Sequence, residues 1–175
     1  LWAEKRTRSA FSNLYVAGFV TVLLVLAGTG GIVSLLLFGA TALDPVLGTA
    51  IAIMLLYTTI AIRDLLRHSD AVYEQLQLNG SLEKAREAIG KIVGRDTKDL
   101  SQSQITKACI ETVAENMVDG ITAPLFFAVL ASFAAPILGM SPLSCSVIGA
   151  FLYKAANTMD SMIGYKNEKY LEFGR

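Results

Sequence analysis

The sequence has few of the residues that mark disulfide-rich or zinc-binding proteins. Cys109 and Cys145 are its two cysteines, 36 positions apart, which gives neither a disulfide framework nor a metal-ligand spacing, so we expect two free thiols. Histidine occurs once, as His68 in a charged stretch, and we favour a structural role for it. The sequence also lacks the G-x-x-x-x-G-K-[ST] loop and the G-x-S-x-G elbow, so it gives no support for a Walker-type ATPase or a common hydrolase.

Net charge is absent too. The 15 basic and 15 acidic residues give a formal charge of zero, so no basic field predicts a nucleic-acid partner. Hydrophobic residues make up 53% of the chain, charged residues only 17%, and the mean hydropathy is +0.50. This composition is too apolar for an ordinary soluble domain and indicates a membrane protein.

Two uncharged runs in the N-terminal third predict transmembrane helices. Residues 9–43 carry no charge, and residues 14–38 exceed the ~20 apolar residues that cross a bilayer. A signal peptide is excluded because the run is too long and a second run, residues 45–62, follows it. Pro45 suits the first turn of that second helix, and the pair is expected to form an antiparallel hairpin. Three glycines within the first run are interpreted as helix-packing positions rather than a phosphate loop: Gly28, Gly30 and Gly31.

Residues 63–120 change to an amphipathic, charged pattern that predicts a water-exposed lobe of three helices. The first is expected over residues 63–78, before the stop signal Asn79-Gly80. Ser81 caps the second, which is expected to end at Gly94. The third begins at Ser101, in an S-x-x-Q capping box, and continues to about residue 119.

Residues 121–153 are again uncharged, but three prolines and a glycine interrupt them. We therefore expect a hairpin of two short helices or a re-entrant pair, followed by a polar tail, residues 154–175. The predicted fold is all-α: a polytopic integral membrane protein with transmembrane helices and a cytoplasmic helical lobe. Its ranges 1–62, 63–120 and 121–175 are expected to form one structural unit.

The positive charges predict the orientation in the membrane. All 15 Lys and Arg residues fall before residue 9, within residues 63–120, or after residue 153. The predicted spans place these three regions on one side, and the positive-inside rule makes that side cytoplasmic. The chain begins with Leu1 rather than Met, and we expect it to be a piece of a longer protein.

An acidic row carries the first candidate chemistry. Glu111, Glu115 and Asp119 recur every four residues in a predicted helix, so their carboxylates share one edge and repel one another. A divalent cation such as Mg²⁺, which prefers carboxylate and phosphate oxygens, would relieve that repulsion. A solvated acidic face is the alternative, and the spacing alone favours it.

Two further groups are candidates for phosphate or substrate binding. Arg95 and Asp96 follow Gly94 in a loop, where an arginine offers two-pronged hydrogen bonding to phosphate. Lys154, Asn157 and Asp160 follow at three-residue steps along one helical face. The alternatives are an ordinary capped loop in the first case, and a lysine reaching lipid headgroups in the second.

Together these motifs resemble the adenosylcobinamide-phosphate synthase family of cobalamin biosynthesis, the CbiB/CobD type. The resemblance rests on four segments: the SAFSNLYVAGF region near the N-terminus, IVGRDTKDL (residues 92–100), ETVAENMVDGITAPLFF (residues 111–127) and YKAANTMDSMIGYKNEKYLEFG (residues 153–174). The last three follow one another in the family's order.

The resemblance implies an ATP-dependent amide ligase that joins adenosylcobyric acid to (R)-1-amino-2-propanol or its O-2-phosphate, with ATP and Mg²⁺ as cofactors. The roles it implies are catalytic for Glu111, Glu115 and Lys154; substrate or nucleotide binding for Arg95, Asp96, Asn116, Asn157 and Lys166; and metal binding for Glu115, Asp119 and Asp160.

The resemblance also implies the surroundings: the inner cell membrane, several passes, an active face on the cytoplasmic side, a lipid bilayer, and other cobalamin-assembly membrane proteins as partners. A non-enzymatic signalling relative of the same superfamily is the alternative, disfavoured because the chain has both the ENMVDG and NTMDSM segments. A small transporter ranks last, since Asp44 alone lies near a predicted span.

Overall fold

A computed structural model describes residues 2–77, 80–94, 96–165 and 167–174, and every regular element within them is helical. This confirms the all-α prediction. The chain divides into two compact units, Leu1–Thr59 with Ala123–Arg175 and Ile60–Thr122. We call the first the apolar unit and the second the lobe. Their assembly into one structural unit stays a prediction.

The first predicted helix is confirmed and is long enough to span a membrane. A short helix α1 (Trp2–Ala10) leads to α2 (Leu14–Leu43), whose 30 residues give ~45 Å of helix, more than the ~30 Å of a bilayer core. Asn13 starts α2, since its side-chain oxygen accepts hydrogen bonds from the amides of Tyr15 and Val16. Asp44 ends α2 and caps the next helix through the Leu47 amide, at 2.9 Å.

The second span, predicted over residues 45–62, is shorter than expected. Helix α3 (Pro45–Thr58) has 14 residues, or ~21 Å, less than the bilayer core. It ends where Thr58 and Thr59 turn their hydroxyls back onto the carbonyls of Leu55 and Leu56, at 2.6 and 2.7 Å, a bond that competes with helix continuation. The hairpin with α2 is confirmed, and Gly48 packs so close to Thr41 that a side chain there would collide with it.

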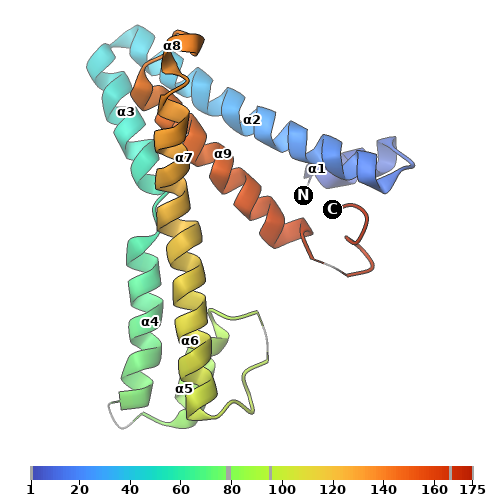
Figure 1. The fold of residues 1–175 in the computed structure, drawn as a ribbon, viewed down its shortest axis with the longest axis vertical. Helices are drawn as coiled ribbons and strands as arrows, with labels where there is room; N and C mark the ends of the chain where they lie inside the picture. The colour runs from blue at the N-terminus through green and yellow to red at the C-terminus, as the bar shows by residue number, and fades with distance from the viewer. Residues whose placement is uncertain (1, 78–79, 95, 166, 175) are drawn as a thin grey trace. The chain divides into compact units, whose positions relative to one another are not determined.

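The interrupted apolar stretch forms the predicted hairpin with unequal arms (Figure 1). Helix α7 (Ala123–Ser132) is followed by the single turn α8 (Ala135–Leu138) and by α9 (Pro142–Ile163). Gly139 makes the bend with a φ of 63°. The expectation of two short helices is wrong for α9, which has 22 residues and includes the first ten of the predicted polar tail.

Small residues let the helices of the apolar unit approach closely. A side chain at Gly149 of α9 would collide with Ala131 and with the Phe127 carbonyl of α7. One buried cluster joins α2, α3 and α9 through Val33, Leu37, Ala52 and Val147. A second joins α2, α9 and the C-terminal segment through Ala17, Met159, Ile163 and Phe173.

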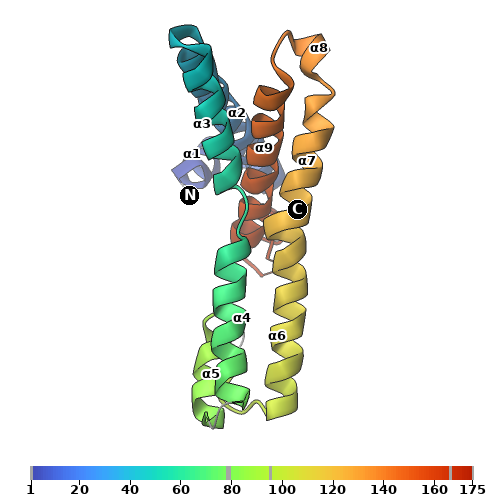
Figure 2. The same ribbon diagram turned by 90° about the vertical axis from the view of Figure 1, so that its left-hand side faces the viewer.

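The lobe is built from α4 (Ile62–Gln77), α5 (Leu82–Gly90) and α6 (Gln102–Met117), and α4 and α6 run side by side in Figures 1 and 2. Their apolar faces form a small core of Val72, Ala85, Ile89, Ile105 and Ala108.

The predicted caps of the lobe are confirmed. The Ser81 side chain accepts from the Lys84 amide, and Ser101 and Gln104 form the capping box. The predicted end of α5 at Gly94 is wrong. The helix stops at Gly90, after which shorter-range bonds from Lys91 and Ile92 to Ala88 and Ile89 close the turn. The Asn79 stop signal lies outside the described residues.

Helix α6 runs into a π-helical turn, η1 (Val118–Thr122), before α7. Pro124 explains the turn: it has no N–H for the Gly120 carbonyl, and in a regular helix its ring would clash there. That carbonyl accepts from the Ala61 amide instead, at 3.0 Å. Within the described residues, the continuous run Gln102–Ser132 and α2 are the two helices long and apolar enough to cross a membrane.

Candidate functional site

A pocket of about 410 Å³ lies in the lobe, between one face of α6 and the loop that follows α5. The acidic row and Asn116 line it from α6 and η1, and Gly94 lines it from the loop. The full lining is Ile92, Val93, Gly94, Ala108, Glu111, Thr112, Glu115, Asn116 and Asp119. The structure therefore brings together four predicted site residues: Glu111, Glu115, Asn116 and Asp119. We call this pocket the acidic pocket.

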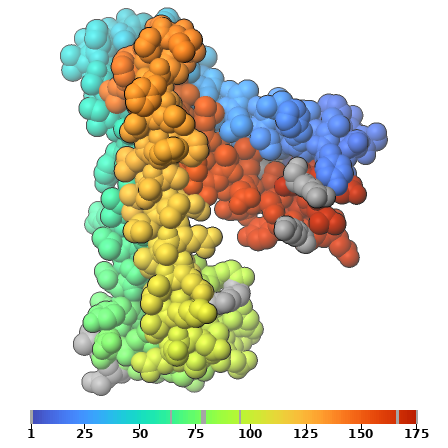
Figure 3. All heavy atoms as spheres, in the orientation of Figure 1, coloured from blue at the N-terminus to red at the C-terminus, as the bar shows by residue number. Residues whose placement is uncertain are grey.

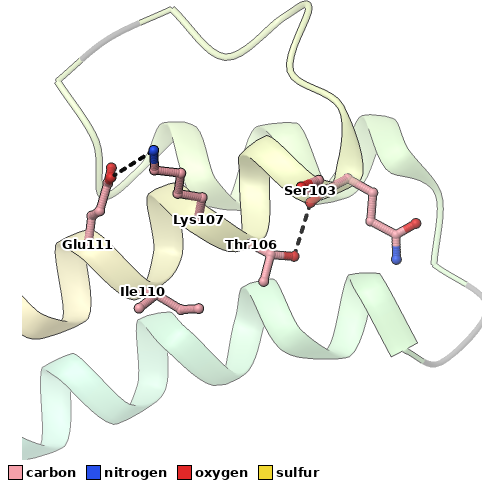
Figure 4. A pocket seen from close by; sticks show the side chains of 6 residues that line it. Ser103, Thr106, Lys107, Ile110 and Glu111 are labelled. Atoms are coloured by element: carbon pink, nitrogen blue, oxygen red, sulfur yellow. Dashed lines mark hydrogen bonds and ion pairs between the residues drawn. The ribbon is translucent and has the colours of Figure 1, made fainter.

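Glu111 lies at the border of the acidic pocket. Its carboxylate is 3.8 Å from the Lys107 ammonium, and both side chains are more than half exposed, so the pair adds little stability. Figure 4 shows Lys107 directed along α6 toward Glu111, beside a second, open hollow on the same helix. Lys107 thus partly balances the charge of the first carboxylate in the row.

Glu115 lies one turn further along α6 and is exposed. Among the described residues, no cation or hydrogen-bond donor contacts its carboxylate, in contrast to Glu111. Asn116, the next residue, is oriented by its own helix, because its amide nitrogen donates to the Thr112 carbonyl at 2.9 Å. That bond leaves the amide oxygen of Asn116 available as an acceptor. The combination is rich in acceptors and suits a cation.

The loop between α5 and α6 is fixed by hydrogen bonds to α5. Arg86 donates from Nε to the Leu100 carbonyl at 2.8 Å, and the Thr97 hydroxyl donates to the Arg86 carbonyl at 3.0 Å. Asp96 accepts from the Lys98 amide at 3.1 Å, which makes it a turn-forming residue. These bonds hold Gly94 at the pocket, while Arg95 lies outside the described residues.

The residue set of the acidic pocket fits Mg²⁺ only in combination with a phosphate ligand. Magnesium is commonly held by one or two carboxylates plus substrate phosphates and water, and Glu115 and Asp119 provide two such carboxylates. In the described part of the chain, no group of three His, Cys, Asp or Glu side chains is arranged to hold a metal by itself. The pocket therefore does not form an all-protein metal cage.

The third group of predicted residues lies on α9, in the apolar unit. Lys154 and Asn157 are half-buried and Asp160 is exposed. Tyr153, next to Lys154, stacks on Phe127 of α7 with ring centroids 5.0 Å apart, which anchors this part of α9. Lys166 lies outside the described residues. A meeting of this group with the acidic row stays a prediction.

Sequence reasoning missed a cluster that ties the C-terminal segment to α1. Glu4 is buried and accepts from Arg8 Nε at 3.1 Å, with the Lys169 ammonium 3.8 Å away. Arg8 also donates to the Lys169 carbonyl at 2.8 Å and lies over the Phe173 ring, 4.2 Å from its centroid. In Figure 3 the C-terminal segment lies against the N-terminal helices. We call Glu4, Arg8, Lys169 and Phe173 the clasp.

Burial of the Glu4 carboxyl favours its neutral form, whereas the positive charges of Lys169 and Arg8 favour the carboxylate, and its pKa lies below the usual glutamate value. No local pattern indicates this cluster, because Arg8 and Lys169 are 161 positions apart.

Comparison with known proteins agrees with the resemblance. The family model described as CobD/Cbib protein matches residues 1–175, the whole chain. No solved structure matches it.

Three similar curated relatives are each described as a cobalamin biosynthesis protein CobD. The one from Desulfotalea psychrophila is 46% identical over 174 residues, which cover 98% of this chain and 52% of the relative. Those from Leptospira interrogans and Clostridium perfringens are 45% and 44% identical, over 98% of this chain and 50% of each relative. The chain thus spans about half the length of these relatives.

Proposed function

Because the chain belongs to the CobD/Cbib family, we propose that it acts in cobalamin biosynthesis as part of an ATP-dependent amide ligase. The substrates would be adenosylcobyric acid and (R)-1-amino-2-propanol or its O-2-phosphate, and the product adenosylcobinamide or its phosphate. The names of the relatives favour this biosynthetic role over a signalling role. The observation that carries the proposal is the acidic pocket, which gathers the carboxylates and the amide of the family motif in one place.

The reaction has a definite chemical requirement. A carboxylate is a poor acyl donor, so a carboxylate oxygen of the corrinoid first attacks the γ-phosphorus of ATP, and ADP leaves. The amine nitrogen then attacks the carbonyl carbon of the acyl phosphate, and phosphate leaves with that oxygen. Negative charge accumulates on phosphate oxygens in the first step and must be balanced by cations.

The residues of the acidic pocket suit this step. Glu115 and Asp119 would hold Mg²⁺, which supplies positive charge to the phosphates when bound. Asn116 would position a donor group of the substrate through its amide oxygen, and Glu111 would accept a proton. Arg95, which follows Gly94 in the sequence, would supply a guanidinium to the phosphates.

From α9, Lys154 would contribute a cation and Asn157 an amide for the same substrates. Lys166 would contribute a further cation. The location we propose is the inner membrane, with several passes and the lobe on the cytoplasmic side, where ATP is available. The positive charges of the lobe and of the chain ends support this orientation. Other membrane proteins of cobalamin assembly are the partners we propose.

The test is to replace Glu115 in the full-length protein and to measure amide formation with Mg-ATP. Glu115→Gln keeps the size of the side chain but removes its charge, so we expect kcat to fall by about a hundredfold or more. Glu87→Gln is the matched control: an exposed carboxylate on α5 that does not line the acidic pocket. Full activity of the Glu115 variant would remove this residue from the site.

A further inference from the structure

A second pocket of about 350 Å³ lies within the apolar unit, between the first half of α2, the end of α9 and the C-terminal segment. Its walls are apolar, from Phe19, Val22, Met159 and Ile163, with backbone and glycine surface between them. Among the described residues that line it, Asp160 is the one ionisable side chain. The clasp borders the pocket through Phe173, which lies in the pocket wall and beneath the Arg8 guanidinium.

Three glycines shape this pocket. A side chain at Gly18 would collide with the Phe173 carbonyl oxygen, one at Gly174 with the Ile163 carbonyl oxygen, and one at Gly164 with Asp160 itself. The C-terminal segment can therefore lie against α2 and α9 only with glycine at positions 18 and 174. Asp160 lines this hollow while its side chain stays exposed to solvent.

The chemistry of the lining selects a kind of ligand. Asp160 offers two acceptor oxygens, and no cation among the described residues contacts them. A small ligand that carries an ammonium group on a short apolar stem would pair its charge with Asp160 and place the stem against Phe19 and Val22. A free phosphate or carboxylate would meet the repulsion of Asp160, with no described basic residue in the lining to offset it.

We propose that this pocket binds the primary ammonium group of the amine substrate, with Asp160 as its acceptor. The inference rests on the proposed function, and it assigns Asp160 to the amine instead of to a metal. A lipid headgroup such as that of phosphatidylethanolamine presents the same chemistry, a primary ammonium beside an apolar body, so the two sources are separated by experiment.

The test is calorimetric titration of the full-length protein with 1-amino-2-propanol, without ATP or corrinoid. The neutral isostere propane-1,2-diol reports binding without the charge. We expect the amine to bind more tightly than the diol, and Asp160→Asn to weaken amine binding about tenfold while diol binding is unchanged. Glu168→Gln, an exposed carboxylate of the C-terminal segment outside the pocket, should bind like the wild type. Equal amine affinity of the wild type and Asp160→Asn would overturn the proposal.

Binding measurements in lipid vesicles distinguish the soluble amine from the lipid headgroup as the ligand of this pocket. If phosphatidylethanolamine occupies the pocket, 1-amino-2-propanol binds more weakly in vesicles of that lipid than in phosphatidylglycerol vesicles, and Asp160→Asn removes the difference. Equal affinity in both vesicles assigns the pocket to the soluble amine.

The proposed ligase activity and the proposed amine pocket can be refuted independently of each other. In the active enzyme, Asp160→Asn should raise KM for the amine about tenfold, with a smaller change in kcat. A protein without ligase activity that still binds the amine through Asp160 would refute the ligase alone. A ligase whose amine KM is insensitive to Asp160 would refute the pocket alone.

Discussion

At Gly18, packing in the apolar unit leaves no room for a side chain. The Phe173 carbonyl occupies the space that its Cβ would need, and backbone cannot move aside as a flexible side chain can. The glycine at position 18 is therefore explained by the C-terminal segment, which lies against it although it is more than 150 positions away in the sequence. No local pattern in the sequence indicates this contact.

Gly18→Ala should lower the free energy of unfolding by about 1–3 kcal/mol, because the new methyl group forces the C-terminal segment off α2. Thermal unfolding in detergent measures this. Gly28→Ala is the matched control on the same helix, since nothing lies within 4 Å of its added Cβ; the packing role predicted for Gly28 is therefore wrong. This variant should be at least as stable as the wild type, because alanine is the better helix former. Equal stability of both variants would show that the segment does not lie on Gly18.

Glu4 gives the clasp a dependence on pH. Its folded-state pKa is lowered, so its contribution to stability is complete above the unfolded-state pKa of about 4.3 and is lost as pH falls through the folded value. The stability of the wild type should therefore drop more between pH 6 and pH 3 than that of Glu4→Gln, which has no carboxyl to protonate.

The comparison is made by thermal unfolding over this pH range, with Glu168→Gln as the control. Glu168 is exposed, and its replacement should leave the acid-induced loss unchanged. An identical pH dependence of the wild type and Glu4→Gln would contradict the charge pairing in the clasp.

Sequence reasoning predicted the shared position of residues whose neighbours lie within a helical turn, and their functional roles stay predictions. The acidic row was predicted from its four-residue spacing, and the acidic pocket contains all three carboxylates. Thr112 was missed, although it lies one turn before Asn116 and orients it. The clasp and the Asp160 pocket depend on contacts between the two ends of the chain, and spacing within one segment cannot reveal those.

At the scale of elements, helix starts were predicted better than helix ends. Each capping serine accepts a hydrogen bond from the amide three residues later, so the cap can be predicted from local sequence. The structure has both caps. The ends of α3 and α5 were predicted too late, because Thr59 and Gly90 stop these helices without a proline or a positive φ. The π-turn had a signal that was overlooked: Pro124 stands four residues after Gly120.

Ser101→Ala tests the capping box of α6. Loss of the cap should cost about 1 kcal/mol of the stability of the lobe, since the Gln104 amide loses its acceptor. Urea unfolding followed by circular dichroism measures the change. Ser103→Ala is the control, made on the same helix two positions later. A Ser101 variant as stable as the control would mean that the box contributes nothing.

At the scale of the whole molecule, the chain divides into two compact units of different character. The apolar unit has helices that fit a membrane protein, and the lobe carries the acidic pocket on a small core of its own. The chain belongs to a family of cobalamin biosynthesis. The proposed ligase would use the acidic pocket of the lobe for the nucleotide, and the proposed amine pocket lies within the apolar unit.

The most direct test of the proposed ligase mechanism follows a carboxylate oxygen of the corrinoid into the released phosphate. The corrinoid carboxylate is labelled with ¹⁸O, the full-length protein is supplied with Mg-ATP and the amine, and the released phosphate is analysed by mass spectrometry. If the carboxylate attacks ATP, each new amide is accompanied by one ADP and by one phosphate that carries a labelled oxygen. Unlabelled phosphate, or amide formed without cleavage of ATP, would contradict the ligase mechanism.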